Sequence, residues 1–349
     1  ERDDILAIME TMIAEVFKVT TGVEVPLPLK RLSYDEAMNK YGSDKPDLRF
    51  DMEMFDLSET MKGSDFKVFE SVLAAGGRIK GINVKGNAGI PRRELDGLVD
   101  YVGQYGAKGM AWIGYTAEGL KSQISKFFSE EKLAAIKRVA QAEEGDLVLI
   151  IADKPKVSQN AMGQLRLEMA RRMNLIDPDK QSFLWVLDFP MFEYDDEEKR
   201  FVAMHHPFTS PRDEDIQYLE SDPGRIKAKA YDMVLNGTEI GGGSIRIFQR
   251  DVQEKVFKAI GLSQEEAVEK FGYLMEAFEF GTPPHGGIAF GLDRLIMLMA
   301  KRASIRDVIA FPKTQSATDM MSQAPSEVSL RQLKELSIRT EIAAKKTQK

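Results

Sequence analysis

The sequence predicts a mixed α/β (α+β) fold, in which an antiparallel sheet flanked by helices carries a separate, inserted α+β unit. Three observations favour this class. Residues 231–247 have the alternation and turn residues of a β-hairpin. Between about residues 57 and 180, strand-like runs alternate with helical ones. Near the C-terminus, a glycine separates a short apolar strand, 288–290, from an amphipathic helix.

The hairpin contains a candidate metal site. Alternating apolar residues lead into Asn236-Gly237, a pair that tolerates the positive φ angles of a two-residue turn. Such a turn sets Val234 opposite Glu239, which makes Asp232 and Glu239 diagonal neighbours, roughly 7–8 Å apart. That gap suits one divalent ion held by two carboxylates and further phosphate oxygens. Taken alone, an acidic residue on each arm of a hairpin is more often a solvated face.

The glycines Gly241 to Gly243 follow on the second arm, and Arg246 stands just beyond them. Glycines allow a ligand to approach the backbone closely, and the planar guanidinium of an arginine suits bidentate capture of a carboxylate or phosphate. Strict alternation would place Arg246 on the face opposite Glu239. If both residues serve one site, the glycine run must therefore hold a β-bulge.

The composition excludes several classes of function. The chain has 349 residues, 43% hydrophobic and 30% charged, which is enough for two or three globular domains. Because it contains no cysteine, disulfides, thiolate metal sites and cysteine nucleophiles are excluded. No apolar run reaches membrane-spanning length. The net charge of −7 argues against broad nonspecific binding of nucleic acid, although a local basic patch could hold RNA.

The N-terminal part begins with an amphipathic helix that we expect to end near Gly22. Its apolar side is expected to consist of Ile5, Ile8, Met9, Met12, Ile13 and Val16. An extended segment, 23–29, and a short helix, 34–39, follow. The loop 41–49 is dense in polar residues with alternating charges, which is typical of a surface turn.

The region from 57 to 180 is interpreted as an inserted domain. We predict helices at 66–75, 91–104, 130–142 and 161–173, and strands at 78–84, 110–115 and 146–152. Pro91 is expected at the first helical position. Since the region contains no histidines, paired carboxylates or phosphate loop, a binding or structural role is expected.

The next segment contains two of the three histidines. A strand at 182–189 is predicted to return through a charged tip, 195–199, to a strand at 201–204. His205-His206 then precede a Pro-Phe turn. From these residues alone, a structural role and a role in substrate contact are equally open.

The C-terminal third is expected to bind an anion at the start of a helix. Ser263 and Glu266 form a capping box for a helix that follows the hairpin. A stiff loop, 281–287, leads to the strand 288–290 and to a helix that opens at Gly291. A helix N-terminus offers unpaired N–H groups to phosphate, although this signal is weak by itself. A final helix is predicted at 329–344.

The run GTPPHGGIAFGLDR, residues 281–294, resembles motif 3 of the class II aminoacyl-tRNA synthetases. Four further runs resemble the bacterial type of aspartyl-tRNA synthetase: YGSDKPDLR, MHHPFTSP, AYDMVLNGTEIGGGSIRI and IRDVIAFPKTQSA. Residues 57–180 resemble the insertion domain of that type, named GAD. The resemblance covers nearly the whole chain, and its motifs are long and in order.

The resemblance implies roles for individual residues. Asp232 and Glu239 match the acidic residues that hold the Mg²⁺ bridging the phosphates of ATP. Arg246 matches the arginine that grips the side-chain carboxylate of aspartate, and His205 matches a histidine on a mobile loop that closes over the amino acid.

Two further segments receive roles in the same way. Gly291, Leu292, Asp293 and Arg294 match the ATP-binding part of motif 3, with Arg294 near the terminal phosphate. Ser43, Asp44 and Lys45 lie in a loop near the amino-acid pocket.

The implied reaction is the activation of L-aspartate by ATP. The α-carboxylate attacks the α-phosphorus, which gives aspartyl-adenylate and pyrophosphate, and the aspartyl group then passes to the 3′ end of tRNA. Positioning and charge neutralisation by Mg²⁺, Arg246, Arg294 and Glu239 are expected to supply the catalysis. The absence of a plausible nucleophile is consistent with this chemistry.

One departure from the family pattern concerns the N-terminal side. Counterparts of the OB-fold anticodon domain, of motif 1 and of motif 2 are not found. We therefore expect a C-terminal part of the enzyme that is inactive alone. The expected domains are a catalytic domain in two parts, 1–56 and 181–320, the GAD insertion at 57–180 and an extension at 321–349. The family implies a cytoplasmic homodimer without membrane attachment.

Two alternatives stand beside this reading. One is an asparaginyl-tRNA synthetase, against which Arg246 argues, because an amide side chain has no charge to neutralise. The other is a noncatalytic module that binds tRNA or an adenylate. The retained Asp232, Glu239, Arg246 and Arg294 favour an enzyme.

Overall fold

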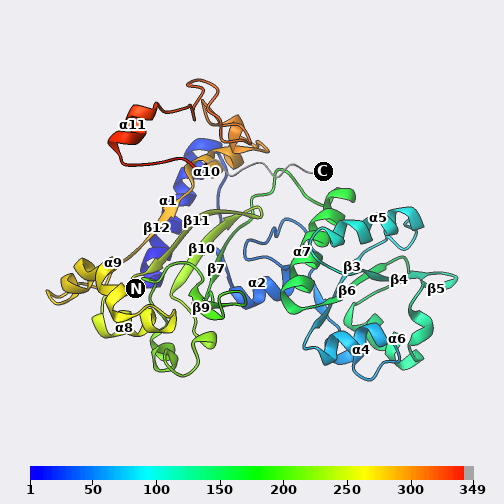
Figure 1. Cartoon of the computed structure of the whole chain (residues 1–349). Helices are drawn as coiled ribbons and strands as arrows, with labels where there is room; N and C mark the ends of the chain where they lie inside the picture. Colours follow the sequence, from blue (N-terminus) through cyan, green and yellow to red (C-terminus); the bar gives the residue numbers. More distant parts are fainter. Residues whose placement is uncertain (342–349) are drawn as a thin grey trace. The chain divides into compact units, whose positions relative to one another are not determined.

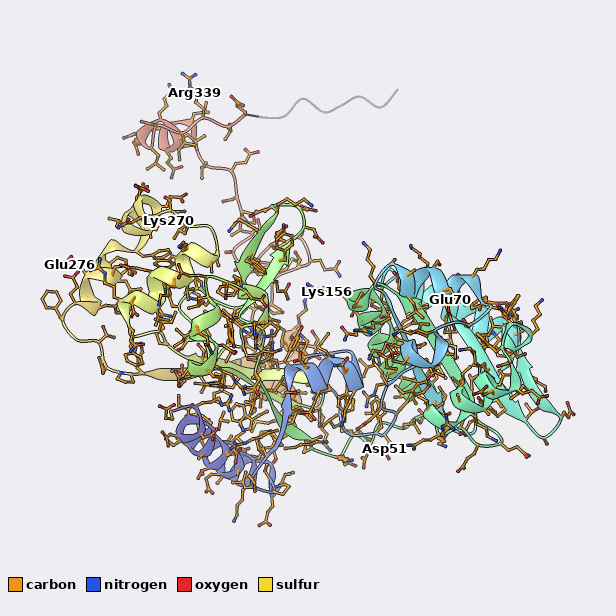
Figure 2. All side chains as sticks on the ribbon, turned by 90° about the horizontal axis from the view of Figure 1, so that it is seen from below. Asp51, Glu70, Lys156, Lys270, Glu276 and Arg339 are labelled. Carbon is orange, nitrogen blue, oxygen red and sulfur yellow. The ribbon has the colours of Figure 1, made fainter. Side chains whose placement is uncertain are left out.

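The computed structural model describes residues 1–341. The chain divides into two compact units, residues 1–291 and 292–349. Figure 1 labels most of their helices and strands, and Figure 2 draws the side chains on the same ribbon. The fold is mixed α/β, as predicted, with two five-stranded sheets in the first unit. Among the described residues, no helix is both long and apolar enough to cross a membrane.

The first sheet has the strand order β1-β7-β10-β11-β12. Its strands are β1 (Lys30–Ser33), β7 (Phe183–Leu187), β10 (Ala230–Leu235), β11 (Thr238–Ile245) and β12 (Gly286–Phe290). The four strands from β7 to β12 pair antiparallel, as expected, whereas the edge strand β1 runs parallel to β7.

Helix α1 (Arg2–Thr21) covers one face of this sheet. The indole Nε1 of Trp185 donates a hydrogen bond to Glu10 Oε1 at 3.0 Å. Phe17 packs edge-on against Phe183, with ring centroids 4.9 Å apart. In the pairing of β7 with β10, Trp185 is opposite Met233, so the neighbouring Asp232 points to the other face.

The predicted end of α1 is confirmed, since Gly22 caps it with φ 74°. The predicted apolar side is right only in part: Ile13 is buried and Ile5, Met9 and Val16 are half-buried, but Ile8 and Met12 are exposed. The buried residues also include Leu6, Glu10 and Phe17, which the prediction left out. Glu10 can be buried because its carboxylate accepts the hydrogen bond from Trp185. A polar residue therefore does not mark the exposed side of this helix.

The other face of the first sheet packs on a core formed with helix α2 (Tyr34–Tyr41) and helix α8 (Arg250–Ala259). This core includes Leu32, Leu184, Val186 and Val234 from the strands. The face that carries Asp232 is therefore apolar where α2 and α8 pack on it.

The second sheet is built entirely from residues 55–153, in the order β2-β3-β6-β4-β5. Its strands are β2 (Phe55–Asp56), β3 (Arg78–Val84), β4 (Ala111–Thr116), β5 (Gly119–Ser122) and β6 (Leu147–Asp153). All its pairings are antiparallel. Its helices are α3 (Ser58–Met61), α4 (Lys67–Ala74), α5 (Arg92–Gly103), α6 (Glu130–Val139) and α7 (Pro155–Arg172), with a 3-10 turn, η1, at Ser125–Phe127.

Both faces of the second sheet are apolar. Leu147, Leu149 and Ile151 of β6 join the core under α5 and α7, and Val148 and Ile150 join the core under α3, α4 and α6. This explains why the strand reads as one continuous apolar run. Pro91 is the N-cap of α5 instead of its first helical residue.

A separate hairpin follows β7. Strands β8 (Phe192–Asp195) and β9 (Arg200–Ala203) pair only with each other. The charged tip and the return strand are found where they were predicted, but the tip joins β9 to the short strand β8, whereas the strand predicted at 182–189 is β7 of the first sheet. Strand β7 ends at Leu187 because Asp188 adopts a positive φ of 60°, and the chain leaves the sheet there.

Helix α9 (Gln264–Phe278) has the predicted capping box, with Ser263 and Glu266 hydrogen-bonded to each other's backbone N–H. It packs on α8 through Phe257, Ala267 and Met275. Two 3-10 segments precede the hairpin: η2 (Asp213–Tyr218) and η3 (Pro223–Arg225).

The second unit contains α10 (Leu292–Met299), a 3-10 turn, η4 (Ile305–Asp307), and α11 (Leu330–Glu335). The final helix is shorter than the predicted 329–344, since it ends at Glu335. Residues 342–344 of that prediction lie outside the described residues.

Candidate active site

The hairpin of β10 and β11 has the predicted turn and register. Asn236 and Gly237 both adopt positive φ, 53° and 80°, and Val234 lies opposite Glu239. This register places Asp232 and Glu239 on one face of the sheet, as the sequence predicts.

A β-bulge follows immediately. The pairing shifts between Met233 and Val234, so that Met233 lies opposite Gly241 and Ile240 is the extra residue. Beyond the bulge, Gly242 is opposite Asp232 and Ser244 is opposite Ala230. Continuing the alternation from Ser244 brings Arg246 to the face of Glu239. The structure therefore contains the required bulge, placed just ahead of the three glycines.

The glycines serve two different contacts. A Cβ on Gly242 would stand 2.7 Å from Asp232 Oδ1 and 3.3 Å from Glu239 Oε1, so both carboxylates converge above this residue. A Cβ on Gly241 would meet the Phe290 ring at 2.8 Å, and one on Gly243 would meet the β12 backbone. Gly242 thus leaves room for the carboxylates, while its neighbours allow β12 to approach closely.

The electrostatics of this pair fit a bound cation. The pKa of Asp232 is raised to about 7, because burial disfavours its charged form and the charges of Glu239 and Asp44 add to the effect. Lys45 opposes the shift only in part. A divalent ion would neutralise the repulsion that raises this pKa, and two carboxylates are ligands that Mg²⁺ prefers.

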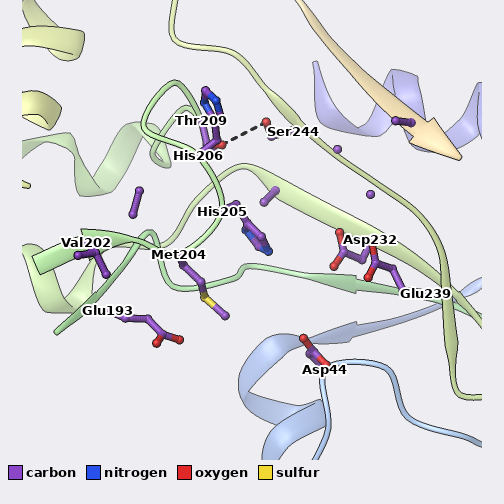
Figure 3. A pocket seen from close by; sticks show the side chains of 15 residues that line it. Asp44, Glu193, Val202, Met204, His205, His206, Thr209, Asp232, Glu239 and Ser244 are labelled. Carbon is purple, nitrogen blue, oxygen red and sulfur yellow. Dashed lines mark hydrogen bonds between the residues drawn. The ribbon is translucent and has the colours of Figure 1, made fainter. Parts of the chain in front are cut away.

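A cavity of about 830 Å³ opens above the carboxylates. Figure 3 shows Asp232 and Glu239 at one side of it, His205 towards the middle and Asp44 on the loop below. The remaining polar lining includes Glu193, His206, Thr209 and Ser244.

His205 points into this cavity from the loop after β9. Its ring packs edge-on against Phe189, with centroids 4.7 Å apart. Burial lowers the pKa of His205 despite the attraction of Asp44, Glu239 and Glu193. The imidazole is therefore neutral near pH 7, and it can donate or accept a hydrogen bond without adding charge.

Arg246 lies in an adjoining hollow of about 740 Å³, which shares His206, Gly242, Gly243 and Ser244 with the first. Its guanidinium stacks on Phe208, with Cζ 4.3 Å from the ring centroid. Its backbone N–H donates to His285 O at 2.9 Å. Burial lowers the pKa of Arg246 from its ordinary value, but an arginine keeps its charge at pH 7.

The loop with Ser43, Asp44 and Lys45 reaches the same region. Asp44 lines the cavity of the carboxylates. Ser43 Oγ accepts a hydrogen bond from the Lys45 backbone N–H at 3.1 Å. All three residues also line a third cavity, of about 960 Å³, between α2, α7 and the β8–β9 hairpin.

The expected ATP-binding segment is divided between the two units. Gly291 ends the first unit, and its N–H donates to Ile240 O at 2.9 Å. Leu292, Asp293 and Arg294 form the first turn of α10 in the second unit. The side chain of Arg294 is exposed there.

Three residues that line the cavity were not predicted from the sequence: Glu193, Thr209 and Ser244. The hydroxyls of Thr209 and Ser244 lie 3.4 Å apart. Ser244 could have been found from the bulge, because the shifted alternation puts it on the face of Glu239. Glu193 has no comparable signal, since it lies in a charged hairpin of ordinary appearance.

Comparisons with known proteins identify the family of the chain. A model of the family described as "tRNA synthetases class II (D, K and N)" matches residues 1–315. The aspartate–tRNA(Asp/Asn) ligase of Heliobacterium modesticaldum is 58% identical over 345 residues, covering 99% of this chain and 57% of that protein. The aspartate–tRNA ligase of Halalkalibacterium halodurans is 54% identical over 339 residues, covering 97% and 57%. The chain thus spans less than two thirds of the length of these relatives.

Proposed function

Because the chain belongs to the class II aminoacyl-tRNA synthetases of the D, K and N group, we propose that it supplies the aspartate- and magnesium-binding part of an aspartate–tRNA ligase. The whole ligase of this kind would activate L-aspartate with ATP and transfer it to the 3′ end of tRNA. The observation that supports this most strongly is the bulge at Ile240, which sets Arg246 on the face of Asp232 and Glu239.

Aspartate fits the charges of the two adjoining hollows. Arg246 is a fixed cation in one of them, stacked on Phe208, and it offers a planar donor pair to the side-chain carboxylate. Asp44 and Glu193 line the other hollow, where their carboxylates can accept hydrogen bonds from the ammonium group of the amino acid. His205 stands among them as a neutral hydrogen-bonding group.

Asp232 and Glu239 would hold the Mg²⁺ of the nucleotide. The ion would neutralise charge on the phosphates of ATP while the α-carboxylate of aspartate attacks the α-phosphorus. The residues of this chain contribute by binding and orienting the substrate. Arg246 fixes the side chain of the amino acid, and the glycines Gly241 to Gly243 allow the amino acid to lie close to β11.

The remaining roles rest on the sequence resemblance. Gly291 to Arg294 are proposed to bind ATP, with Arg294 at the terminal phosphate. Residues 57–180 are proposed as a GAD insertion, between two parts of the catalytic domain. We also propose a cytoplasmic homodimer as the working form.

A second candidate, asparagine activation, is less well supported. An amide side chain would leave the guanidinium of Arg246 without a countercharge in a half-buried site, and such a mismatch is costly. Binding without chemistry, the third alternative, would need no carboxylate pair poised for a cation.

The test is calorimetric titration of the chain with a nonhydrolysable aspartyl-adenylate analogue and with its asparaginyl counterpart. We expect the aspartyl form to bind about 100-fold more tightly, which is the selectivity of a satisfied charge pair over an unsatisfied one. Arg246→Ala should remove this preference. The matched control is Arg250→Ala, because Arg250 pairs with Glu254 and Glu279 on the surface and lines neither hollow. Equal binding of the two analogues by the unsubstituted chain would contradict the proposal.

A further inference from the structure

Arg166 is a fully buried charged residue outside the cavity, on helix α7 of the inserted region. Only 1% of its surface is exposed. Its Nε donates to Met52 O at 2.7 Å, and its Nη2 donates to Asp47 O at 3.0 Å and to Phe50 O at 3.2 Å. No other residue of α7 is both charged and buried.

The ring planes of two aromatic residues complete its surroundings. The guanidinium lies 4.0 Å from the Phe50 ring centroid and 5.0 Å from that of Tyr41. Burial of a cation costs free energy unless its donors are satisfied. Here three backbone carbonyl groups of one loop accept hydrogen bonds from Nε and Nη2. These hydrogen bonds join Arg166 to the backbone of residues 47–52, and not to a side-chain carboxylate.

The same loop is fastened to α7 at its other end. Gly42 adopts φ 68°, and a Cβ placed there would stand 2.3 Å from Gln159 O. A Cβ on Gly163 would stand 2.8 Å from Gly42 O. The backbones of the loop and of α7 are therefore in direct contact at Gly42, while Arg166 holds the segment that begins at Asp47.

Asp44 lies between these two anchors and lines the cavity of the carboxylates. The Asp47 end also touches the hairpin, because a Cβ on Gly237 would stand 3.1 Å from Asp47 Cβ. The carboxylate of Asp47 is itself bound by Arg49 at 2.7 Å. The loop that presents Asp44 is thus clamped between α7 and the β10–β11 turn.

We propose that Arg166 is a positioning residue: by holding the carbonyl groups of Asp47, Phe50 and Met52, it fixes Asp44 at the cavity and makes the amino-acid site depend on α7 of the inserted region. This inference rests on the proposed function for the identity of the ligand. It assigns to the inserted region a part in substrate binding for which its own two cores, both apolar, give no indication.

The test compares three forms of the chain: unsubstituted, Arg166→Lys and Arg172→Lys. Lysine keeps the charge and much of the length, but its single ammonium cannot reproduce the fork of donors that reaches three carbonyls. Arg172 is the matched control, because it lies on the same helix and, within residues 1–341, its ion pair is with Glu168, at 2.8 Å. Arg166→Gln, which removes the charge, serves as a second variant if the lysine form does not fold.

Two measurements are made on each form. Hydrogen–deuterium exchange is followed in peptides that cover residues 42–52 and in peptides of the second sheet. Binding of the aspartyl-adenylate analogue and of Mg²⁺–ATP is measured by calorimetry. We expect Arg166→Lys to speed exchange in 42–52 alone and to weaken binding of the aspartyl analogue about tenfold or more, with Mg²⁺–ATP binding nearly unchanged. Arg172→Lys should resemble the unsubstituted chain.

Each other outcome overturns a definite statement. Unchanged exchange in 42–52 overturns the positioning role, whatever the ligands do. A parallel loss of both ligands, together with faster exchange throughout, shows that Arg166 only stabilises the fold. If the unsubstituted chain binds neither ligand, the proposed function fails, and this inference fails with it.

Discussion

Asp146 and Asp232 stand in the two different sheets, and their pKa values shift in opposite directions. Asp146, the residue just before β6 of the second sheet, has a lowered pKa, whereas the pKa of Asp232 in the first sheet is raised to about 7. Both side chains are removed from water to a large extent, and for both the largest single influence is burial, which raises the pKa. The difference lies in what surrounds them.

Asp146 is surrounded by donors. Lys85 Nζ donates at 2.9 Å and Asn83 Nδ2 at 3.0 Å. The backbone N–H groups of Glu143 and Gly86 donate at 2.9 and 3.0 Å. Together these hydrogen bonds outweigh the effect of burial on the pKa of Asp146, so its charge is stabilised by the protein itself and needs no ligand.

Asp232 is surrounded by like charges, those of Glu239 and Asp44. A fold that leaves two carboxylates converging above a glycine has a ready site for a cation. The donors around Asp146 stabilise its charge within the fold, whereas the like charges of Glu239 and Asp44 beside Asp232 make this carboxylate pair the proposed site for a cation.

The largest effect is expected from Asp232→Asn. Because the folded pKa is above the ordinary value of 3.8, the contribution of Asp232 to stability is fully present below about pH 4 and is lost as the pH rises to 7. The loss is at most about 4 kcal/mol, from about 1.4 kcal/mol per pKa unit. The variant should therefore be more stable than the unsubstituted chain at pH 8 and nearly equal at pH 4, in chemical unfolding without Mg²⁺.

The control for this experiment is Asp196→Asn, an exposed aspartate at the β8–β9 turn. It should leave the pH dependence unchanged. A variant at Asp232 that destabilises the chain at pH 8 would show that the carboxylate is satisfied, which would remove the contrast with Asp146.

Asp146→Asn should have the opposite sign. The neutral amide loses the charge-assisted hydrogen bonds and leaves donors unsatisfied, which should cost about 3 kcal/mol at pH 7. Since the folded pKa is lowered, the stability due to Asp146 is present above about pH 4 and is lost as the pH falls further. Urea unfolding should show that the variant has a much lower free energy of unfolding than the unsubstituted chain at pH 7 and a slightly lower one at pH 3. The control is Glu144→Gln, at an exposed neighbouring residue. Equal stability at pH 7 would contradict the assignment.

Gly242→Ala should have a smaller effect on stability and a specific effect on the site. The new methyl group would stand 2.7 Å from Asp232 Oδ1, so the carboxylates must move, at a cost of about 1–2 kcal/mol. Mg²⁺ binding should weaken with it. The control is Gly97→Ala in α5, where nothing lies within 4 Å of the added methyl and where alanine should stabilise the helix by up to about 1 kcal/mol. Unchanged Mg²⁺ binding would place the ion elsewhere.

Glu239→Gln should have the smallest effect, and it sharpens the comparison. Removing this like charge lowers the pKa of Asp232, because Glu239 is the second-largest cause of its raised value. The fall of stability with rising pH should then begin at a lower pH in thermal melts. An unchanged profile would mean that burial alone sets the pKa of Asp232.

The hairpin register could be predicted from the sequence because it depends on local chemistry, the Asn236-Gly237 turn and the alternation on either side. The need for a bulge could also be argued from Arg246. Its position at Ile240 could not, because a bulge is fixed by packing: Ile240 is completely buried, and nothing in its own side chain marks it as the extra residue.

The misjudged buried side of α1 and the overlooked Arg166 have a common cause. Glu10 and Arg166 lie within otherwise apolar helical stripes, and each is buried because a partner distant in sequence satisfies it. Hydrophobic periodicity places such residues outside the core. The burial of Arg166 could have been suspected from the sequence, because it lies between Met162 and Met169 on the apolar side of a predicted helix. The burial of Glu10 is explained only by its contact with Trp185 in the folded protein.

The most direct test of the contrast between the two sheets is carbon-13 NMR titration of the aspartate carboxyl groups, with the signals of Asp232 and Asp146 identified from their asparagine variants. We predict a midpoint near 7 for Asp232 without Mg²⁺ and a clear fall when Mg²⁺ is added, while Asp146 titrates below its ordinary value in both conditions. An Asp232 signal that titrates near pH 4 and does not respond to Mg²⁺ would contradict the assignment of this carboxylate pair as a metal site.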